Sequence, residues 1–238
     1  EWDSKRVYVW FEAVQGYYTC ARIWASRFAS NEGHPDGEDA WKRWWNVPES
    51  GESPKHIYFM GKDNIPFHTI IWPAIIMGLN ASNASEISHI PNIGDLILED
   101  NVSANEYLML HGGQFSKSRR HAVWLPSYLD QYDADSLRYY LSINMPETHD
   151  TDFRWDEYVD RVNNELIGTY GNFVHRVMTL SHRLDSDSGN PLSHYDGISD
   201  QSETIQEVVK QISSAIESME KQRFKEALRS IMGIAQIG

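Results

Sequence analysis

A short apolar strand, a polar loop and an apolar helix follow one another directly between residues 56 and 79. Residues 56–60 read His-Ile-Tyr-Phe-Met, an apolar and aromatic run of the length of a buried strand. Gly61 to Asn64 form the loop, and Pro66 suits the first turn of a helix expected over residues 65–79. This order is the repeating unit of α/β proteins, so we predict a parallel sheet covered by helices.

A second strand is predicted near the start of the chain, over residues 7–11, which are rich in β-branched and aromatic side chains. A helix should follow over residues 18–29, and Trp41, Trp44 and Trp45 have the spacing of a short helix packed in the core. In open α/β sheets ligands bind at the carboxyl ends of the strands, which places residues 10–17 and 61–68 around one crevice. No Gly-x-Gly-x-x-Gly is present, so a dinucleotide is not indicated.

The pattern changes towards the C-terminus. We expect a strand over residues 106–111, helices over 122–132 and 134–144, the second capped by Asp133 or Asp135, and a last strand containing Phe153 and Trp155. After about residue 157 the apolar residues follow a helical period, over residues 159–184, 203–221 and 224–236, with a polar connection over 186–201. The predicted domains are residues 1–104, 105–157 and 158–238, the last an all-α bundle.

Composition narrows the function classes. The 238 residues carry a formal net charge of −13, which disfavours broad nonspecific binding to nucleic acid, although a local basic face could still bind phosphates. The sequence has no run of apolar residues long enough to span a membrane and no signal peptide, so we predict a cytoplasmic protein without a membrane partner. Cys20 is the single cysteine, which excludes an internal disulfide and a Cys-x-x-Cys zinc site, and we predict no metal site.

A basic loop stands out against this acidic background. No acidic residue occurs between Glu106 and Asp130, and this window contains Gly112-Gly113-Gln114-Phe115-Ser116-Lys117-Ser118-Arg119-Arg120. Glycines allow a loop to move with a reacting phosphate, and a cation stabilises the charge that develops on it. We therefore interpret the loop as a polyphosphate-binding segment with Lys117 as its catalytic cation; the alternative is a solvated surface turn.

These segments, in this order, resemble the class I aminoacyl-tRNA synthetases, and most closely the methionyl-tRNA synthetases. The resemblance runs nearly end to end and rests on the following strings: Val9-Trp10-Phe11-Glu12-Ala13-Val14-Gln15-Gly16-Tyr17, Gly61-Lys62-Asp63-Asn64, Phe67-His68, Trp72-Pro73-Ala74, Gln114-Phe115-Ser116-Lys117-Ser118, Asp133-Ala134-Asp135-Ser136-Leu137-Arg138-Tyr139-Tyr140 and Arg161-Val162-Asn163. It implies an incomplete Rossmann-type catalytic domain, a helical region around residues 105–157 with the lysine loop and stem contacts, and a truncated anticodon-binding helix bundle.

The sequence also departs from the family pattern. Gln114 and Phe115 stand where the Lys-Met-Ser-Lys-Ser loop of the family has its first lysine and its methionine, so only the second lysine is retained, as Lys117. The His-Ile-Gly-His motif and the zinc knuckle are absent from these residues. We expect both upstream of Glu1, in an N-terminal half of a longer parent enzyme, and expect zinc, if present, only there.

The resemblance implies formation of methionyl-adenylate from methionine and ATP with Mg²⁺, followed by transfer of methionine to tRNA(Met). Lys117 would stabilise the triphosphate, with Phe115, Ser116, Ser118 and Gly61 also at the ATP. Asp63 would bind the ribose; its alternative role is an Asx turn or helix cap. The implied methionine pocket consists of Trp10, Ala13, Tyr17, His68 and Trp72, although the two tryptophans would be core residues in most proteins.

Asn172 and Arg176 are four residues apart, so they share one face of the predicted helix. By resemblance they read the anticodon, and the alternative is a polar helix surface. Two rival functions remain. One is a sister class I enzyme for leucine, isoleucine, valine or cysteine, and the other is a tRNA-binding or assembly fragment that is inactive when isolated.

Overall fold

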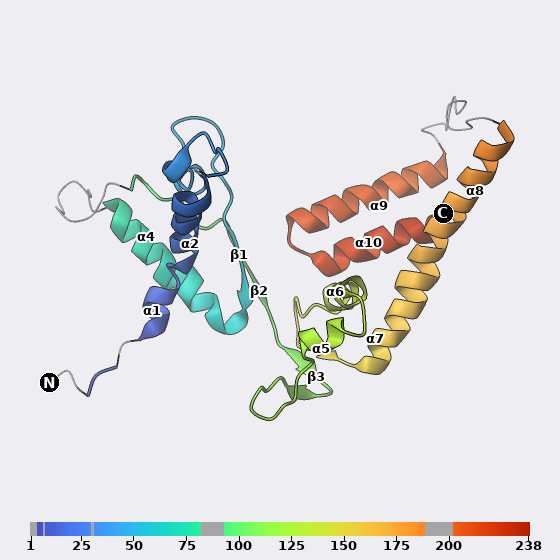
Figure 1. Cartoon of the computed structure of the whole chain (residues 1–238), viewed down its shortest axis with the longest axis horizontal. Coiled ribbons are helices and arrows are strands. Elements are labelled where there is room, and N and C mark those ends of the chain that lie inside the picture. Colours follow the sequence, from blue (N-terminus) through green and yellow to red (C-terminus); the bar gives the residue numbers. More distant parts are fainter. Residues whose placement is uncertain (1–3, 7, 30, 82–92, 189–201) are drawn as a thin grey trace. The chain divides into compact units, whose positions relative to one another are not determined.

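The structure is a computed structural model that describes residues 4–6, 8–29, 31–81, 93–188 and 202–238, without the side chains of residues 184–188. It divides into two units, Glu1–Asn105 and Glu106–Gly238, which are described separately below (Figure 1). The division of the sequence into three domains remains a prediction. No helix within the described residues combines the length and apolar character needed to cross a membrane.

The first unit is built on two parallel strands, β1 (Ile57–Gly61) and β2 (Asn101–Asn105), which lie side by side in Figure 1. Ile57 pairs with Asn101 and Gly61 with Asn105, so both strands end at the same edge. After β1 the chain forms a 3₁₀ turn, η3 (Lys62–Asn64), a π-helical segment, η4 (Phe67–Ile71), and helix α4 (Trp72–Ala81). The predicted strand, loop and helix are therefore confirmed, as is the α/β class.

The predicted strand over residues 7–11 is wrong. The chain forms a short helix, α1 (Val9–Ala13), in which Trp10 and Phe11 are more than half exposed. A strand exists only when a neighbouring strand accepts its backbone hydrogen bonds, and β propensity alone does not supply that neighbour. In the described part of this unit β1 pairs only with β2, and Tyr8 and Trp10 instead pack against the ring of Phe67.

Aromatic side chains fill the core of the first unit. The expected helix over residues 18–29 is confirmed as α2 (Gly16–Trp24) and its π-helical continuation η1 (Ala25–Ala29). A 3₁₀ turn, η2 (Gly37–Asp39), and helix α3 (Lys42–Trp45) follow. Trp41 and Trp45 are buried, as predicted, and meet the ring of Tyr18 edge-on. Trp44 was predicted in the same core but is 54% exposed, because the preceding residue of a helix is turned about 100° away from the buried face of Trp45.

The second unit begins with a three-stranded sheet of order β4-β3-β5, formed by β3 (Leu108–Leu110), β4 (Gly113–Gln114) and β5 (Thr151–Phe153). Strand β3 is the strand predicted over residues 106–111, and it is parallel to β5 and antiparallel to β4. Phe153 lies in β5 as expected, whereas Trp155 begins helix α7 (Trp155–Arg161) rather than extending the strand. Acidic Asp156 and Glu157 in the first turn favour a helix start there.

Two helices connect β4 to β5. Helix α5 (Leu125–Leu129) is shorter than the predicted 122–132, and Pro126 lies in its first turn. Helix α6 (Ala134–Ile143) matches its prediction, and Asp133 rather than Asp135 is its cap, since the Asp133 carboxylate accepts a 2.9 Å hydrogen bond from the Ser136 backbone. Hydrogen bonds from Ser136 also hold the pKa of Asp133 below its usual value.

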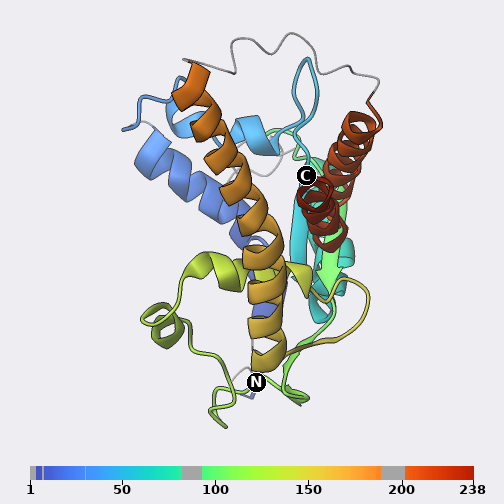
Figure 2. The ribbon, with the colours of Figure 1, turned by 90° about the vertical axis from the view of Figure 1, so that its right-hand side faces the viewer.

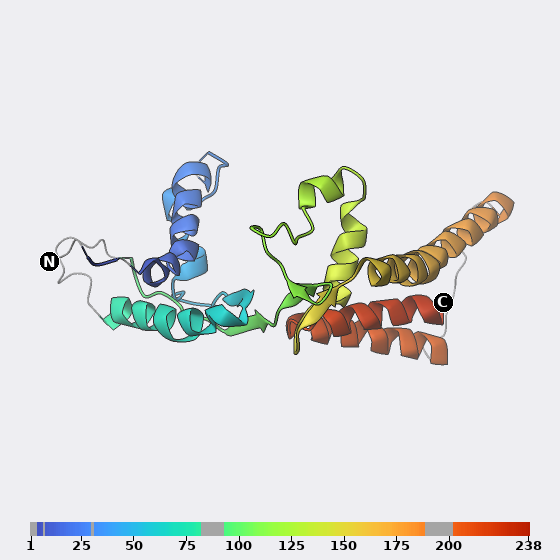
Figure 3. The same ribbon diagram turned by 90° about the horizontal axis from the view of Figure 1, so that it is seen from below.

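The remaining helices confirm the predicted α-helical C-terminal part. Helix α7 continues through a π-helical stretch, η5 (Val162–Gly171), into α8 (Asn172–Ser188), and Figure 2 shows the three as one long helix. Helices α9 (Glu203–Glu220) and α10 (Phe224–Ile237) lie side by side in Figures 1 and 3. Most of the predicted polar connection over 186–201 lies outside the described residues.

Candidate functional site

A cavity of about 480 Å³ opens in the first unit where α1, α2 and η4 meet. Four of the five residues predicted to bind methionine line it, namely Trp10, Ala13, Tyr17 and His68. The complete lining is Trp10, Ala13, Val14, Gly16, Tyr17, Cys20, Phe67 and His68. Its walls are therefore mostly apolar and aromatic, with a phenol and an imidazole as the polar groups, the composition typical of a small-molecule site.

The phenol and the imidazole form a hydrogen-bonded chain. Tyr17 Oη lies 2.9 Å from His68 Nε2, and His68 Nδ1 lies 2.9 Å from the backbone oxygen of Asn64. A carbonyl oxygen only accepts, so Nδ1 carries a hydrogen; in a neutral ring Nε2 then accepts the hydroxyl hydrogen of Tyr17. Both hydrogens are used within this pair of hydrogen bonds, so the oxygen of Tyr17, a residue that lines the cavity, keeps acceptor capacity.

Trp72, the fifth predicted residue, does not line this cavity. It is 1% exposed, and its indole N–H donates a 3.0 Å hydrogen bond to Tyr58 Oη. The Tyr58 ring in turn meets the rings of Tyr17 and His68 at centroid distances of 5.0 and 5.6 Å. Trp72 is thus separated from the cavity by Tyr58, whose pKa burial raises to about 12.

Four lining residues were not predicted from the sequence, namely Val14, Gly16, Cys20 and Phe67. Tyr17 and Cys20 are three residues apart in α2, which places them on one face of that helix, and Ala13 is the last residue of α1. This spacing is visible in the sequence. The predicted helix begins only at residue 18, after the predicted strand over residues 7–11, so Tyr17 lies outside it.

Gly61 and Asp63, predicted at the ATP, follow the carboxyl end of β1. Gly61 is the last residue of the strand and pairs with Asn105, and Asp63 lies in the 3₁₀ turn η3 with an exposed side chain. The carboxyl edge of parallel strands is where α/β folds bind ligands. The N-cap positions of η3 and η4 are Gly61 and Pro66.

The basic loop of the second unit is a tight hairpin. Ser116 and His121 exchange two backbone hydrogen bonds of 2.9 and 3.0 Å, and the Arg120 amide donates to the Lys117 carbonyl at 3.1 Å. Lys117 therefore opens a four-residue turn, and its side chain is exposed. Ser116 Oγ lies 3.2 Å from Ser118 Oγ, and Phe115, just before the turn, is 40% exposed.

Two contacts anchor the base of this hairpin. The Gly112 amide, in a left-handed conformation with φ of 77°, donates to both carboxylate oxygens of Asp152 at 2.9 and 3.0 Å. His121 Nε2 donates to the Leu110 carbonyl at 2.8 Å. A carbon atom added at Gly113 would lie 3.0 Å from that imidazole, so glycine permits the close approach.

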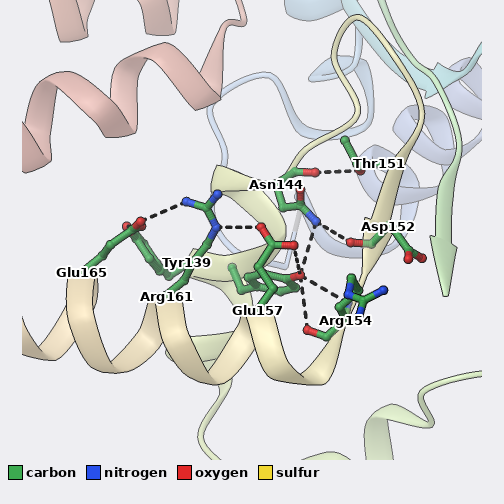
Figure 4. A network of polar contacts seen from close by, with 9 residues as sticks. Tyr139, Asn144, Thr151, Asp152, Arg154, Glu157, Arg161 and Glu165 are labelled. Atoms are coloured by element: carbon green, nitrogen blue, oxygen red, sulfur yellow. Dashed lines mark hydrogen bonds and ion pairs between the residues drawn. The ribbon is translucent and has the colours of Figure 1, made fainter. Parts of the chain in front are cut away.

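From Asp152 a polar network continues into the long helix (Figure 4). The Asn144 amide donates to the Asp152 carbonyl at 2.9 Å, and Arg161 donates to Glu157 and Glu165, each at 3.0 Å. Tyr139 Oη donates to Glu165 at 2.6 Å, and burial together with that carboxylate raises the pKa of Tyr139. The network joins β5, α6, α7 and η5 into one body.

Asn172 and Arg176, predicted to read the anticodon, lie on α8, which begins at Asn172. Both side chains are exposed. Their spacing places them on the same face of the helix, as expected. In the described part of the chain, no group of three His, Cys, Asp or Glu side chains is arranged to hold a metal ion.

A match to the model of a protein family decides which family this chain belongs to. The model described as tRNA synthetases class I (M) matches residues 1–178. The chain belongs to this family. The resemblance drawn from the sequence motifs is confirmed at this level.

Individual relatives agree with the family. This class I synthetase chain is 41% identical over 234 residues to a methionine–tRNA ligase of Roseiflexus sp. (strain RS-1), covering 98% of the chain and 36% of that relative. It is 46% identical over 179 residues to a methionine–tRNA ligase of Dehalococcoides mccartyi (strain CBDB1), covering 75% of the chain and 28% of the relative. The matched part of the chain thus spans only 36% and 28% of the length of these two curated relatives.

The fold is similar to that of solved synthetases. A crystal structure of Mycobacterium tuberculosis methionyl-tRNA synthetase bound by methionyl-adenylate superposes with a TM-score of 0.65 at 21% identity, covering 97% of this synthetase chain and 38% of the other. The apo form of that enzyme gives a TM-score of 0.63. At this identity the likeness supports the fold alone.

Proposed function

We propose that this chain is part of a methionine–tRNA ligase, in which ATP and methionine give methionyl-adenylate and tRNA(Met) then receives the methionyl group. The observation that carries the proposal is the gathering of Trp10, Ala13, Tyr17 and His68 around one cavity in a chain of this family. A flexible, polarizable thioether suits a pocket with aromatic walls. The names of the relatives support the same choice of amino acid.

In this proposal the hydrogen bond between Tyr17 and His68 determines which group of the substrate the cavity accepts. While the Tyr17 hydroxyl donates to His68, its oxygen offers lone pairs to a substrate donor, such as the ammonium group of an amino acid. The apolar walls take the side chain. Trp72 acts from behind Tyr58 and positions the phenol and the imidazole through ring contacts.

The basic hairpin supplies the groups for phosphate. Lys117 is the catalytic cation, and Phe115, Ser116 and Ser118 are its neighbours at ATP, while Gly61 and Asp63 bind ATP from the carboxyl end of β1. Attack of the methionine carboxylate on the α-phosphate breaks the bond to pyrophosphate. The protein accelerates this step mainly by positioning the reactants and by stabilising the charge that develops. Mg²⁺ would arrive with ATP and neutralise part of the triphosphate charge.

Asn172 and Arg176 are proposed to contact anticodon bases, since an amide edge and a guanidinium plane on one exposed helical face suit unstacked bases. The remaining partner is the N-terminal half of the parent enzyme, and the chain spans only 36% of the Roseiflexus relative. Residues 1–238 contain no His-Ile-Gly-His, so we propose that the isolated chain does not form adenylate by itself. We propose the cytoplasm as its location.

Amino-acid-dependent ATP–pyrophosphate exchange by the full-length parent tests the proposal. Methionine, leucine, isoleucine, valine and cysteine are compared at equal concentrations. We expect exchange with methionine to exceed exchange with each of the others by at least about tenfold, because an apolar pocket separates similar side chains by about 1–3 kcal/mol. Preference for another of the five amino acids would assign the chain to a sister class I enzyme. Absence of exchange with all of them would favour a tRNA-binding module.

A further inference from the structure

A second cavity, of about 440 Å³, lies in the second unit beside the basic hairpin. Its lining includes Arg120, Trp124, Ser127, Gln131, Tyr132 and Trp155. It contains none of the residues proposed to bind methionine, ATP or the anticodon. Its volume falls in the range of about 300–1,000 Å³ that is usual for sites of small ligands.

Exposed aromatic rings form much of its wall. Trp124 is 47% exposed, Tyr132 52% and Trp155 38%, whereas Tyr128 is buried. The Tyr128 ring packs against Tyr132 at 5.1 Å and lies nearly parallel to Trp155, at 6.3 Å with an interplanar angle of 18°. The buried tyrosine thus holds two exposed rings in place, which lowers the entropy cost of stacking a flat ligand on them.

The charge of the lining is positive in a chain of net charge −13. Arg120 contributes a guanidinium, and no aspartate or glutamate is among the lining residues. Arg120 has a φ of 53°, a left-handed conformation that is unfavourable for an arginine and ordinary for a glycine. Such strained residues concentrate at functional sites. An arginine at this position costs stability, which points to a use for its side chain.

We infer that this cavity takes one unpaired nucleotide of an RNA strand, with its base stacked on the exposed aromatic rings and its phosphate on Arg120. Ser127 and Gln131 offer hydroxyl and amide groups to the edge of the base. Aromatic platforms beside a cation are the usual means of holding single-stranded nucleic acid. The choice of RNA as the strand rests on the proposed function, and a free nucleotide would share the same chemistry.

Binding of nucleotides to the 238-residue chain tests the inference without any need for catalysis. The probes are an unstructured RNA tetranucleotide and the mononucleotides AMP and UMP, and their affinities are measured by isothermal titration calorimetry. We expect the tetranucleotide to bind and Trp124→Ala to weaken it by about tenfold or more, because stacking on one ring contributes that much. Trp44→Ala removes an equally exposed tryptophan outside this cavity and should leave the affinity unchanged.

The arginine is tested by Arg120→Gly, which removes the charge and relieves the left-handed strain at the same time. We expect a folded protein, with circular dichroism like that of the wild type, and tetranucleotide binding that is weaker and less dependent on salt. Arg138→Ala removes the same charge from the exposed face of α6 and is the matched control. Equal losses in Arg120→Gly and Arg138→Ala would overturn the site.

Three further outcomes overturn the inference. The first is tetranucleotide affinity that does not change in Trp124→Ala, and the second is no binding at millimolar RNA. The third is mononucleotide binding as tight as that of the tetranucleotide, which would assign the cavity to a free nucleotide instead of a strand. All of these outcomes are independent of methionine-dependent exchange, so failure of the cavity and failure of the proposed function can be told apart.

Discussion

Replacing Lys117 by alanine is expected to lower the rate of methionine-dependent ATP–pyrophosphate exchange in the full-length parent by about 100- to 1,000-fold. The turn that carries Lys117 is held by backbone hydrogen bonds between Ser116, His121, Lys117 and Arg120. None of these bonds uses the lysine side chain, so alanine removes the charge and leaves the hairpin intact. A charge that acts in the transition state should lower kcat more than it raises the KM for ATP.

A matched control is Lys210→Ala. Lys210 is a strongly exposed lysine on α9 that pairs with Glu207 at 3.4 Å, and exposed pairs of this kind contribute little to stability. This variant should exchange at the wild-type rate. If the Lys117→Ala enzyme kept the wild-type kcat, the hairpin would have no part in the catalytic mechanism and would be a surface turn.

Replacing Trp72 by alanine is expected to destabilise the first unit by about 3–5 kcal/mol. Trp72 is 1% exposed, packs edge-on against Trp45 at 6.1 Å, and donates to Tyr58. Alanine leaves a large void and removes the hydrogen-bond donor of a buried phenol. Urea unfolding of the chain, followed by circular dichroism and by hydrogen exchange of peptides from residues 57–81, measures the loss.

Two companion variants separate the contributions. Trp72→Phe keeps most of the packing but not the indole N–H, so it should cost about 1 kcal/mol from the hydrogen bond in addition to a smaller void. Trp44→Ala removes an exposed ring and should change stability by less than about 0.5 kcal/mol. If Trp72→Ala were no more destabilising than Trp44→Ala, the position of Trp72 in the core would be wrong.

Local patterns in the sequence predicted much of the fold, because the elements concerned carry their own signals. The strand at β1 is a short apolar run followed by a polar turn, and the helices of the second unit show apolar residues at a helical period. Asp133 lies directly before α6 and caps it through a contact three residues away. Such signals come from residues close together in the chain, so these elements can be predicted from a single sequence.

The failures concern properties set by distant parts of the chain. Residues 9–13 form a helix because the described first unit offers them no strand partner. Trp44 is exposed because Tyr18, from α2, packs against Trp41 and Trp45 instead. Four of the five predicted methionine-binding residues gather around one cavity, whereas Trp72 lies behind Tyr58. The cavity beside Arg120 was not predicted, since it forms only when α5, α7 and the basic hairpin pack together.

Charging of tRNA tests the central claim most directly, because in the proposed function it requires the cavity of Tyr17 and His68, the basic hairpin, and the helix of Asn172 and Arg176 together. The full-length parent is given labelled methionine, ATP and either tRNA(Met) or the same tRNA with one anticodon base replaced. We predict that methionine is attached to tRNA(Met), and that the replaced base or Arg176→Ala lowers the rate by roughly 5- to 150-fold, equivalent to about 1–3 kcal/mol. Absence of methionine transfer, or equal transfer to both tRNAs, would contradict the account.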